Sequence, residues 1–423
     1  MLYQEAVRYL LTLGRELASP SHARAQKFDL RNITVLAERL GNPHRAYPCV
    51  HIAGTNGKGS TAAMLDSILR AAGLRTGLYT SPHLERINER IRVNGQDISD
   101  ADFAVTFHHI LACIEELLAS GALPAHPTYF ECLTAMAFDH FAHACHSESA
   151  AADEESAFRS PKPRTPVDFV VFEVGMGGRL DSTNIVTPEV AVITQIDFDH
   201  ENYLGHSIEE IAAEKAGIIK PGNWVVSAAE NPAARAVISR RAAEMNARLV
   251  ELDTAWRLED VRSDSGRFRA RAFASGFSAG IELAPRLPGR FQLRNALTAA
   301  AAARLLAEHG FRVPDGSAGH GVRVPDGFAG RGFSITDSAI ECGIASAVWP
   351  GRLERLQDRP ALFLDGTHNP AGARELLRFW QEEFPASPDS DRGESRANEV
   401  SRGSRIILVY GAMRDKAVDE IAG

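Results

Sequence analysis

The stretch 50-VHIAGTNGKGSTAAML-65 decides the fold, because an apolar run, a glycine-rich turn and the start of a helical pattern follow one another within it. Its glycines, Gly54, Gly57 and Gly59, surround Lys58. Glycine lets the backbone turn sharply, so that N–H groups can approach a ligand's oxygen atoms. A helix N-terminus adds partial positive charge, and the lysine adds a full one. The stretch therefore predicts a strand, a phosphate-binding turn and a helix that begins near Ser60.

This turn differs from the common phosphate-loop pattern by one residue. The common pattern has Ser or Thr directly after the lysine. Here Gly59 intervenes, and the hydroxyl group comes at Ser60. The alternative is a glycine-rich turn beside a surface lysine, which the agreement of strand, turn and helix disfavours. We expect ATP as the ligand, with its phosphates bound to the backbone amides of Asn56 through Ser60.

The composition is that of a globular protein with more than one domain. The 423 residues are too many for one ordinary core and predict two or three domains. No run of about 18 apolar residues occurs, so we expect no membrane span. The net charge of −8 offers no basic surface, which argues against nucleic acid as a partner. The five cysteines are scattered, which predicts buried free thiols in a cytoplasmic protein. We expect a monomer.

Apolar and helical patterns alternate along the chain. The apolar, β-rich runs are Cys49–Ala53, Phe169–Glu173, Val190–Ile196, Trp224–Ala228, Ala361–Asp365 and Arg405–Tyr410. The helical patterns are Ser60–Ala72, Asp100–Ala119, Tyr129–Cys145, Ile208–Gly217, Pro232–Met245 and Asn295–Gly310. Buried strands that alternate with helices predict an α/β fold with a mostly parallel sheet.

Polar and repetitive stretches interrupt this pattern. Residues 146–166 are acidic and then proline-rich, and residues 387–403 contain almost no large apolar side chains. We expect both to be loops. A short duplication, RVPDGSAG at 312–319 and RVPDGFAG at 323–330, predicts a surface loop. Residues 257–277 predict polar strands or hairpins at the edge of the first domain.

The turn GTNGKGS resembles the ATP loop of the folylpolyglutamate synthase and dihydrofolate synthase family, within the Mur ligase superfamily. Further motifs of that family follow in order: 79-YTSPHLERINERI-91, 128-TYFE-131, 172-FEVGMGGRLDSTN-184, 197-DFDHENYLG-205, 212-AAEKAGIIKPG-222, 288-PGRFQLRNALTAAA-301, 349-WPGRLE-354 and 365-DGTHNPAGA-373. The resemblance implies a P-loop-type ATPase domain with a mostly parallel sheet at 1–348, carrying insertions at about 146–166 and 312–333. A smaller, Rossmann-like α/β domain is expected at 349–423. The family's last domain continues past the point that matches 409–423, so this domain is expected to be incomplete.

The resemblance also implies a reaction, in which a carboxylate is joined to the amino group of L-glutamate. A carboxylate is a poor electrophile, and phosphorylation by ATP supplies a better leaving group. Phosphoryl transfer depends on positioning and on neutralising the charge of oxygen atoms. Magnesium does this with oxygen ligands. ATP and two Mg²⁺ ions are therefore the expected cofactors.

Individual residues take their expected roles from matching positions in the family's motifs. The nucleotide-binding set is Thr55, Asn56, Gly57, Lys58, Gly59, Ser60, Asn295, Arg352 and Asp365, and the metal-binding set is Ser81, Glu173, His200 and Lys215. The catalytic set is Lys58, Lys215 and His368. Glu173 also ends an apolar strand, where a carboxylate faces the crevice in which α/β sheets bind ligands.

For Asn295, Arg352, Asp365 and His368 the alternative is an ordinary polar side chain at the surface, which their positions in the motifs disfavour. Lys215 and His200 have more specific structural alternatives. The family's matching lysine is carbamylated, which turns a cation into an anion beside magnesium and needs an amine whose pKa is lowered by burial. The alternative for Lys215 is a surface lysine paired with Glu214. His is an unusual ligand for magnesium, so the assignment of His200 depends on the resemblance alone, and its alternative is a structural hydrogen bond.

The acceptor substrate is expected to be dihydropteroate or a reduced folate. The residues Thr128, Tyr129, Phe130 and Glu131 resemble the stretch that contacts dihydropteroate in bifunctional members, and two aromatic rings suit a flat pterin. One ring could instead be helix core. We therefore favour both dihydrofolate synthase and folylpolyglutamate synthase activities. The alternatives are the second activity alone, another Mur-type amino-acid ligase, or a nucleotide-binding protein without catalysis.

Overall fold

The computed structural model describes residues 1–14, 29–144, 166–276, 279–313, 322–324, 334–384 and 407–409. Its centre is a sheet of eight strands, in the order β4-β3-β2-β5-β1-β6-β7-β8. The strands are β1 (Cys49–Ala53), β2 (Thr76–Tyr79), β3 (Ile91–Val93), β4 (Gln96–Asp97), β5 (Phe169–Glu173), β6 (Val190–Ile193), β7 (Trp224–Ser227) and β8 (Arg248–Glu251). Strands β2, β5, β1, β6, β7 and β8 run parallel, and β3 and β4 add an antiparallel edge. The predicted mostly parallel sheet is confirmed.

Strand β1 lies in the middle of this sheet, and all of its residues are buried. Its neighbours β5 and β6 both come from much later in the chain. The strand order therefore changes direction at β1, and in open α/β sheets ligands bind in the crevice at such a point, beyond the carboxyl ends of the strands.

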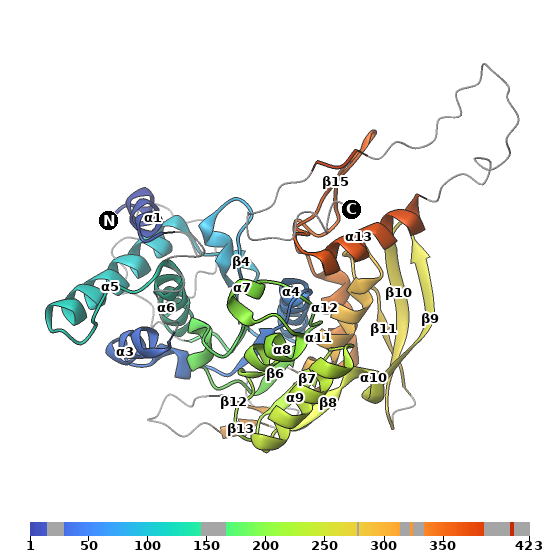
Figure 1. The fold of residues 1–423 in the computed structure, drawn as a ribbon, viewed down its shortest axis with the longest axis horizontal. Helices are drawn as coiled ribbons and strands as arrows, with labels where there is room; N and C mark the ends of the chain where they lie inside the picture. The colour runs from blue at the N-terminus through green and yellow to red at the C-terminus, as the bar shows by residue number, and fades with distance from the viewer. Residues whose placement is uncertain are drawn as a thin grey trace, which may run out of the picture.

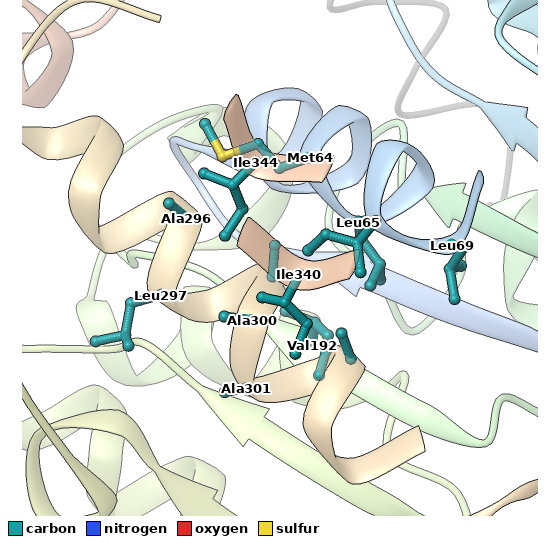
Figure 2. Close-up of a cluster of buried hydrophobic side chains, with 14 of the residues drawn as sticks. Met64, Leu65, Leu69, Val192, Ala296, Leu297, Ala300, Ala301, Ile340 and Ile344 are labelled. Carbon is teal, nitrogen blue, oxygen red and sulfur yellow. The ribbon is translucent and has the colours of Figure 1, made fainter. Parts of the chain in front are cut away.

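One face of the sheet is covered by α4 (Lys58–Ala71), α11 (Phe291–His309) and α12 (Asp337–Ser346). Figure 2 shows apolar side chains of these helices gathered against Val192 of β6: Met64, Leu65, Leu69, Ala296, Leu297, Ala300, Ala301, Ile340 and Ile344. Helices α4 and α12 cross closely, because a Cβ atom at Gly343 would lie 2.3 Å from the Cα atom of Ile68. This packing fixes α4 and, with it, the turn at its start.

The remaining helices form two further apolar clusters. One contains α1 (Tyr3–Thr12), α3 (Arg31–Arg39), α5 (Asp100–Ala119) and α6 (Tyr129–Ala142), and the other contains α8 (Ile208–Ala216) and α9 (Pro232–Glu244). Short helical segments span Pro43–Arg45, Ile87–Arg90, Ser182–Ile185, Glu201–Leu204 (α7) and Leu252–Ala255 (α10). In the part of the chain that the structure describes, no helix has both the length and the apolar character needed to cross a membrane.

Helix α11 begins four residues before the predicted start at Asn295, and α4 begins two residues before Ser60. The thiols of Cys49, Cys113 and Cys132 are buried as predicted, but Cys342 is exposed. The fifth cysteine lies outside the described residues.

A second sheet is antiparallel and consists of β9 (Trp256–Asp264), β10 (Arg267–Ala274) and β11 (Ile281–Leu283). It confirms the polar strands predicted for 257–277. Helix α13 (Pro370–Glu383) lies alongside this sheet in Figure 1. A Cβ atom at Gly266 would lie 2.8 Å from the ring of Phe379, so the last described helix packs against the β9–β10 turn.

The C-terminal part is smaller, as predicted, but its described strands are antiparallel. Strands β14 (Glu354–Asp358) and β15 (Ala361–Leu364) form a two-stranded sheet. The prediction of a strand at 405–410 is wrong for the described residues 407–409, which form no strand and are exposed. No strand of the described C-terminal part pairs with them, so the backbone gains no ladder hydrogen bonds there.

The duplicated stretch also differs from its prediction. Strands β12 (Phe311–Val313) and β13 (Val322–Val324) pair antiparallel, so the starts of the two copies form a ladder instead of a loop. In the sequence, valine and arginine residues alternate there, a pattern that suits a strand. The rest of the duplication, residues 146–165 of the first insertion and residues 387–403 lie outside the described residues.

Candidate active site

Three neighbouring strand ends form the floor of the site, because β5, β1 and β6 end side by side. Glu173 ends β5, Gly54 follows β1 and Thr194 follows β6. Gly54 has φ +152°, and a Cβ atom there would lie 1.8 Å from Oγ1 of Thr194. The threonine hydroxyl donates a hydrogen bond to the carbonyl oxygen of Asn56 at 2.8 Å. Only glycine fits at this first position of the turn.

The rest of the turn is tied to the segment after β6 and to α11. The backbone N–H of Thr55 donates to the carbonyl oxygen of Gln195 at 2.8 Å, and its hydroxyl donates to that of Asp197 at 2.9 Å. Gly57 has φ +87°, and a Cβ atom there would lie 2.3 Å from Oδ1 of Asn295. The N-terminus of α4 therefore opens towards the site with its partial positive charge.

Two lysines converge on one carbonyl group of the turn. Nζ of Lys58 donates to the carbonyl oxygens of Gly54 at 3.1 Å and of Thr55 at 3.0 Å. Nζ of Lys215, on α8, donates to the same Gly54 oxygen at 2.9 Å. Lys215 is only 3% exposed, so the alternative of a surface lysine is wrong. The carboxylate of Glu214 forms an ion pair with Arg179 at 2.7 Å.

Glu173 is a buried carboxylic acid that faces the cations of the site. It is 4% exposed, and its Oε2 accepts a hydrogen bond from the backbone N–H of Ser81 at 3.1 Å. Burial raises the pKa of Glu173 above its ordinary value, and the nearby charge of Lys58, the Ser81 N–H and the charge of Arg352 oppose this shift. A bound cation would stabilise the ionised form further.

The donors present fit a magnesium ion held mainly by its nucleotide. Among the described residues, no group of three or more His, Cys, Asp and Glu side chains is placed to hold a metal ion. Magnesium is often held by one or two carboxylates together with phosphate oxygens and water. Ser81 and Glu173 both line the same cavity and offer oxygen atoms, so this pair fits that pattern.

A further carboxylate, Asp199, gathers residues from two distant motifs. Its Oδ1 accepts from the backbone N–H of His200 at 2.9 Å. Its Oδ2 lies 3.8 Å from Nε2 of His200, 3.8 Å from Nε2 of His368 and 3.3 Å from Nδ2 of Asn369. The structure thus brings the two predicted histidines to one acid, which sequence analysis did not single out.

The C-terminal segment is braced by Asp365. Its Oδ2 accepts from the backbone N–H of Leu353 at 2.8 Å, and its Oδ1 accepts from that of Thr367 at 2.8 Å. The Arg352 guanidinium donates to the carbonyl oxygen of Gly351 at 2.8 Å, and its charge acts on Glu173. Asp365 therefore has a structural role beside the predicted contact with ATP.

These groups line one cavity of about 450 Å³ between the main sheet and the C-terminal part. The predicted residues that line it are Thr55, Asn56, Gly57, Lys58, Gly59, Ser60, Ser81, Glu173, His200, Lys215, Asn295, Arg352, Asp365 and His368. The predicted nucleotide, metal and catalytic sets therefore meet at one place, although they come from widely separated motifs.

The predicted substrate residues are not among the described residues that line this cavity. Thr128 and Glu131 form a capping box at the start of α6, with hydrogen bonds of 3.2 and 2.7 Å between side chains and backbone N–H groups. The spacing Thr-x-x-Glu is a known signature of this cap and could have been recognised in the sequence. Tyr129 is 6% exposed and packs under Arg90. Phe130 lies against Gly175, which does line the cavity. Their substrate role stays a prediction.

Comparisons with known proteins agree with this geometry. Residues 156–303 match the model of the Mur ligase middle domain. The dihydrofolate synthase/folylpolyglutamate synthase of Bacillus subtilis is 34% identical over 96% of this chain and 81% of its own length. A solved complex of folylpolyglutamate synthase with AMPPCP and folate matches with a TM-score of 0.73, 31% identity, and coverage of 91% of this chain and 81% of that one. The Mycobacterium tuberculosis folylpolyglutamate synthase, solved with ADP and AMPPCP, has a TM-score of 0.69 at 32% identity, over 90% of this chain and 75% of that one.

This degree of identity over nearly the whole chain establishes the family. The chain belongs to the dihydrofolate synthase/folylpolyglutamate synthase family of Mur-type ligases.

Proposed function

We propose that this member of the family is an ATP-dependent ligase that joins L-glutamate to dihydropteroate and, as γ-linked glutamate, to reduced folates. The observation that carries this proposal is the single cavity in which the glycine turn after β1 meets residues 365–368 of the C-terminal segment. The Bacillus relative is named for both activities, and a solved relative binds folate beside an ATP analogue. We also propose that the chain acts as a monomer in the cytoplasm, with no nucleic acid or membrane partner.

The nucleotide would be bound by its phosphates. The amides of residues 56–60 and the start of α4 supply N–H donors, and Lys58 would exchange its turn carbonyl contacts for phosphate oxygens. Arg352 offers a guanidinium fork to the same oxygens from the opposite wall. The side-chain amide of Asn295 packs against Gly57, a position from which it can contact the turn or form a hydrogen bond with the nucleotide.

Ser81 and Glu173 would hold a magnesium ion, which supplies charge neutralisation on the phosphate oxygens. Burial of Glu173 removes competing water from this carboxylate. His200 and a carbamylated Lys215 are proposed for the second ion. A carbamate nitrogen keeps one N–H, so the 2.9 Å hydrogen bond from Lys215 to Gly54 is compatible with the modification.

The reaction balances in two steps. An oxygen of the substrate carboxylate attacks the γ-phosphorus atom of ATP, which gives an acyl phosphate and ADP. The amino nitrogen of L-glutamate then attacks the acyl carbon, inorganic phosphate leaves, and the nitrogen loses a proton. His368 faces this cavity from the C-terminal side and is the proposed contact with the reacting centre.

The test is an assay of ADP release with purified protein. We expect release that requires L-glutamate together with dihydropteroate or with tetrahydrofolate, and amide products that mass spectrometry identifies. L-Alanine and diaminopimelate are the control amino acids. If L-glutamate is added to tetrahydrofolate but not to dihydropteroate, the function is folylpolyglutamate synthesis only. Turnover only with a control amino acid would indicate another Mur-type ligase, and nucleotide binding without turnover would overturn the enzymatic proposal.

The carbamylation of Lys215 has its own test. In buffer depleted of bicarbonate we expect activity to fall, and added bicarbonate should restore it. A Lys215→Arg variant keeps the positive charge but forms no stable carbamate, so its activity should be low and independent of bicarbonate. Full activity in a Lys215→Ala variant would reject this role.

A further inference from the structure

Three side chains from distant segments meet beside the phosphate-binding turn. Asn369 is 2% exposed and is the N-cap residue of α13. Its side chain contacts Asn56, 313 positions earlier, and Asp199, which follows β6. Asn56, Asp199 and Asn369 together form what we call the amide clamp.

The contact between the two asparagines is reciprocal. Nδ2 of Asn56 donates to Oδ1 of Asn369 at 3.1 Å, and Nδ2 of Asn369 donates to Oδ1 of Asn56 at 2.9 Å. Nδ2 of Asn369 also donates to Oδ2 of Asp199 at 3.3 Å, and its Oδ1 accepts from the backbone N–H of Gly372 at 2.8 Å. Asparagine offers two donors and one carbonyl oxygen, so every polar group of Asn369 is engaged. Paired amides in this arrangement fix both position and orientation.

The clamp joins the two walls of the proposed active site. Asn56 lies in the turn that would bind phosphates, and Asn369 follows directly after His368 in the C-terminal segment. Asp199 also faces His200 and His368. Asn56, Asp199 and both histidines line the cavity, whereas Asn369 is not among the described residues that do so. Asn369 can therefore influence the site only through its neighbours.

We propose that Asn369 is a positioning residue that fixes the C-terminal segment 365–368 against the phosphate-binding turn. This inference rests on the proposed function, in which the phosphate-binding turn holds the ATP phosphates and residues 365–368 contact the reacting centre from the other wall. An acceptor, a phosphoryl group and an amine react only when they are aligned closely, and small misplacements between such groups lower the rate strongly. Asn369 is not among the described residues that line the cavity, so its substitution removes no side chain that would contact the nucleotide directly, and kcat is the parameter that we expect it to control.

An Asn369→Asp variant separates the clamp from the helix cap. The new side chain keeps an oxygen that accepts from the N–H of Gly372, so α13 keeps its start. It loses both Nδ2 donations, to Asn56 and to Asp199. An Asn369→Ser variant is the second form, since serine also caps helices and adds no charge beside Asp199. Asn231→Asp is the matched control, because Asn231 caps α9 by accepting from the N–H of Ala233 at 2.9 Å and forms no hydrogen bond with the described residues of the turn.

We expect both Asn369 variants to lower kcat by about tenfold or more and to change KM for ATP by less than about threefold. The control should change neither parameter. Hydrogen exchange of the backbone amides at 54–60 should be faster in the Asn369 variants than in the wild type and the control. This exchange is a direct readout of the clamp.

The inference and the proposed function fail in different ways. If the wild-type protein shows no turnover, the proposed function fails, and amide exchange alone then decides whether the clamp holds the turn. If the wild type is active and both Asn369 variants keep its kcat, Asn369 does not position the site. Unchanged exchange at 54–60 would also overturn the inference.

Discussion

Glu173 occupies a position in which ionisation opposes folding. It is buried at the end of β5, and burial raises its pKa above the ordinary value despite the nearby charges of Lys58 and Arg352. The folded state then binds the proton more tightly than the unfolded state does. The free energy of unfolding therefore falls as the pH rises from the ordinary pKa to the raised one, and it stays lower above that range. Such a cost is expected where a carboxylate is kept for binding a cation.

A Glu173→Gln variant should remove this cost and the activity together. We expect its free energy of unfolding to exceed that of the wild type at about pH 8, with a gap that closes as the pH falls towards about 4. Urea unfolding of both proteins at several pH values measures this difference, in which other titrating groups largely cancel. Turnover should be lost, and AMPPCP with magnesium should stabilise the wild type more than the variant. A variant that is no more stable than the wild type at pH 8 would contradict the burial argument.

Gly59 is the residue at which the turn departs from the common phosphate loop, and Trp349 gives the physical reason. A Cβ atom at Gly59 would lie 2.8 Å from Nε1 of Trp349, so the indole ring takes the space of a side chain. The guanidinium group of Arg92 lies 5.0 Å from the centre of the same ring. The start of α4 is therefore packed against the junction with the C-terminal part.

A Gly59→Ala variant should weaken nucleotide binding, although alanine favours a helix over glycine by about 1 kcal/mol. The displaced ring moves the first turn of α4, and overpacking of this kind costs about 1–3 kcal/mol. We expect calorimetry with AMPPCP to show about tenfold weaker binding. Adding Trp349→Leu to the same chain should restore most of the affinity, and Trp349→Leu alone is the control. No recovery in the double variant would show that the ring is not the obstacle.

The close crossing of helices α4 and α12 fixes the position of the phosphate-binding turn at the start of α4. Gly343 lets the two helices approach so closely that its Cα atom faces the backbone of Ile68. Figure 2 shows the apolar side chains of α12 inserted between α4 and α11. A helix crossing that depends on backbone contact cannot adjust by turning a side chain.

A Gly343→Ala variant should therefore destabilise the protein, whereas helix propensity alone predicts a gain. We expect a loss of about 1–3 kcal/mol in the free energy of unfolding, because the new Cβ atom meets backbone at 2.3 Å. Cys342→Ala is the control in the same helix, since that side chain is exposed. Denaturant unfolding measures both. Equal stability of the two variants would mean that α12 shifts freely on α4.

The elements with local signals could be predicted from the sequence, and those with distant partners could not. Helix α5 has the predicted bounds because Ser99 caps it and its apolar pattern is regular. Helix α11 starts early because Asn295 is not its cap. Strands β12 and β13 depend on each other, and residues 407–409 find no partner strand among the described residues. Pairing is a property of two segments, so one segment's pattern does not determine it.

At the scale of the molecule, the sequence predicted which residues gather at the site but not what holds the walls together. The phosphate-binding turn and Glu173 were recognisable because glycine turns and strand ends follow local rules. The other site residues were assigned from the resemblance to the family's motifs. The amide clamp was not, since Asn56 and Asn369 are 313 positions apart and neither has a pattern that indicates the other. Thr128 and Glu131 show the opposite case. Their spacing is a local signal for a helix cap, but we assigned both residues to substrate binding.

The two walls are also joined by an exposed ion pair at the surface. Nη2 of Arg374 on α13 lies 2.7 Å from Oδ2 of Asp197, and the side chains are 57% and 23% exposed. The backbone N–H of Asp197 donates to the hydroxyl oxygen of Thr55, so the pair lies next to the phosphate-binding turn. Exposed pairs contribute about 0.2–1 kcal/mol and are screened by salt.

An Arg374→Glu variant should place two like charges at this contact and lower kcat/KM by roughly two- to tenfold at low salt. The loss should shrink at about 1 M salt, where the screening length falls to about 3 Å. Asp197→Arg in the same chain should restore part of the activity, because the attraction returns with its direction reversed. Arg241→Glu is the matched control, since Arg241 forms an ion pair with Glu244 within α9 and does not link the phosphate-binding side of the cavity to the C-terminal part. A loss that is independent of salt, or one that the control reproduces, would show that the ion pair does not help to dock the C-terminal part.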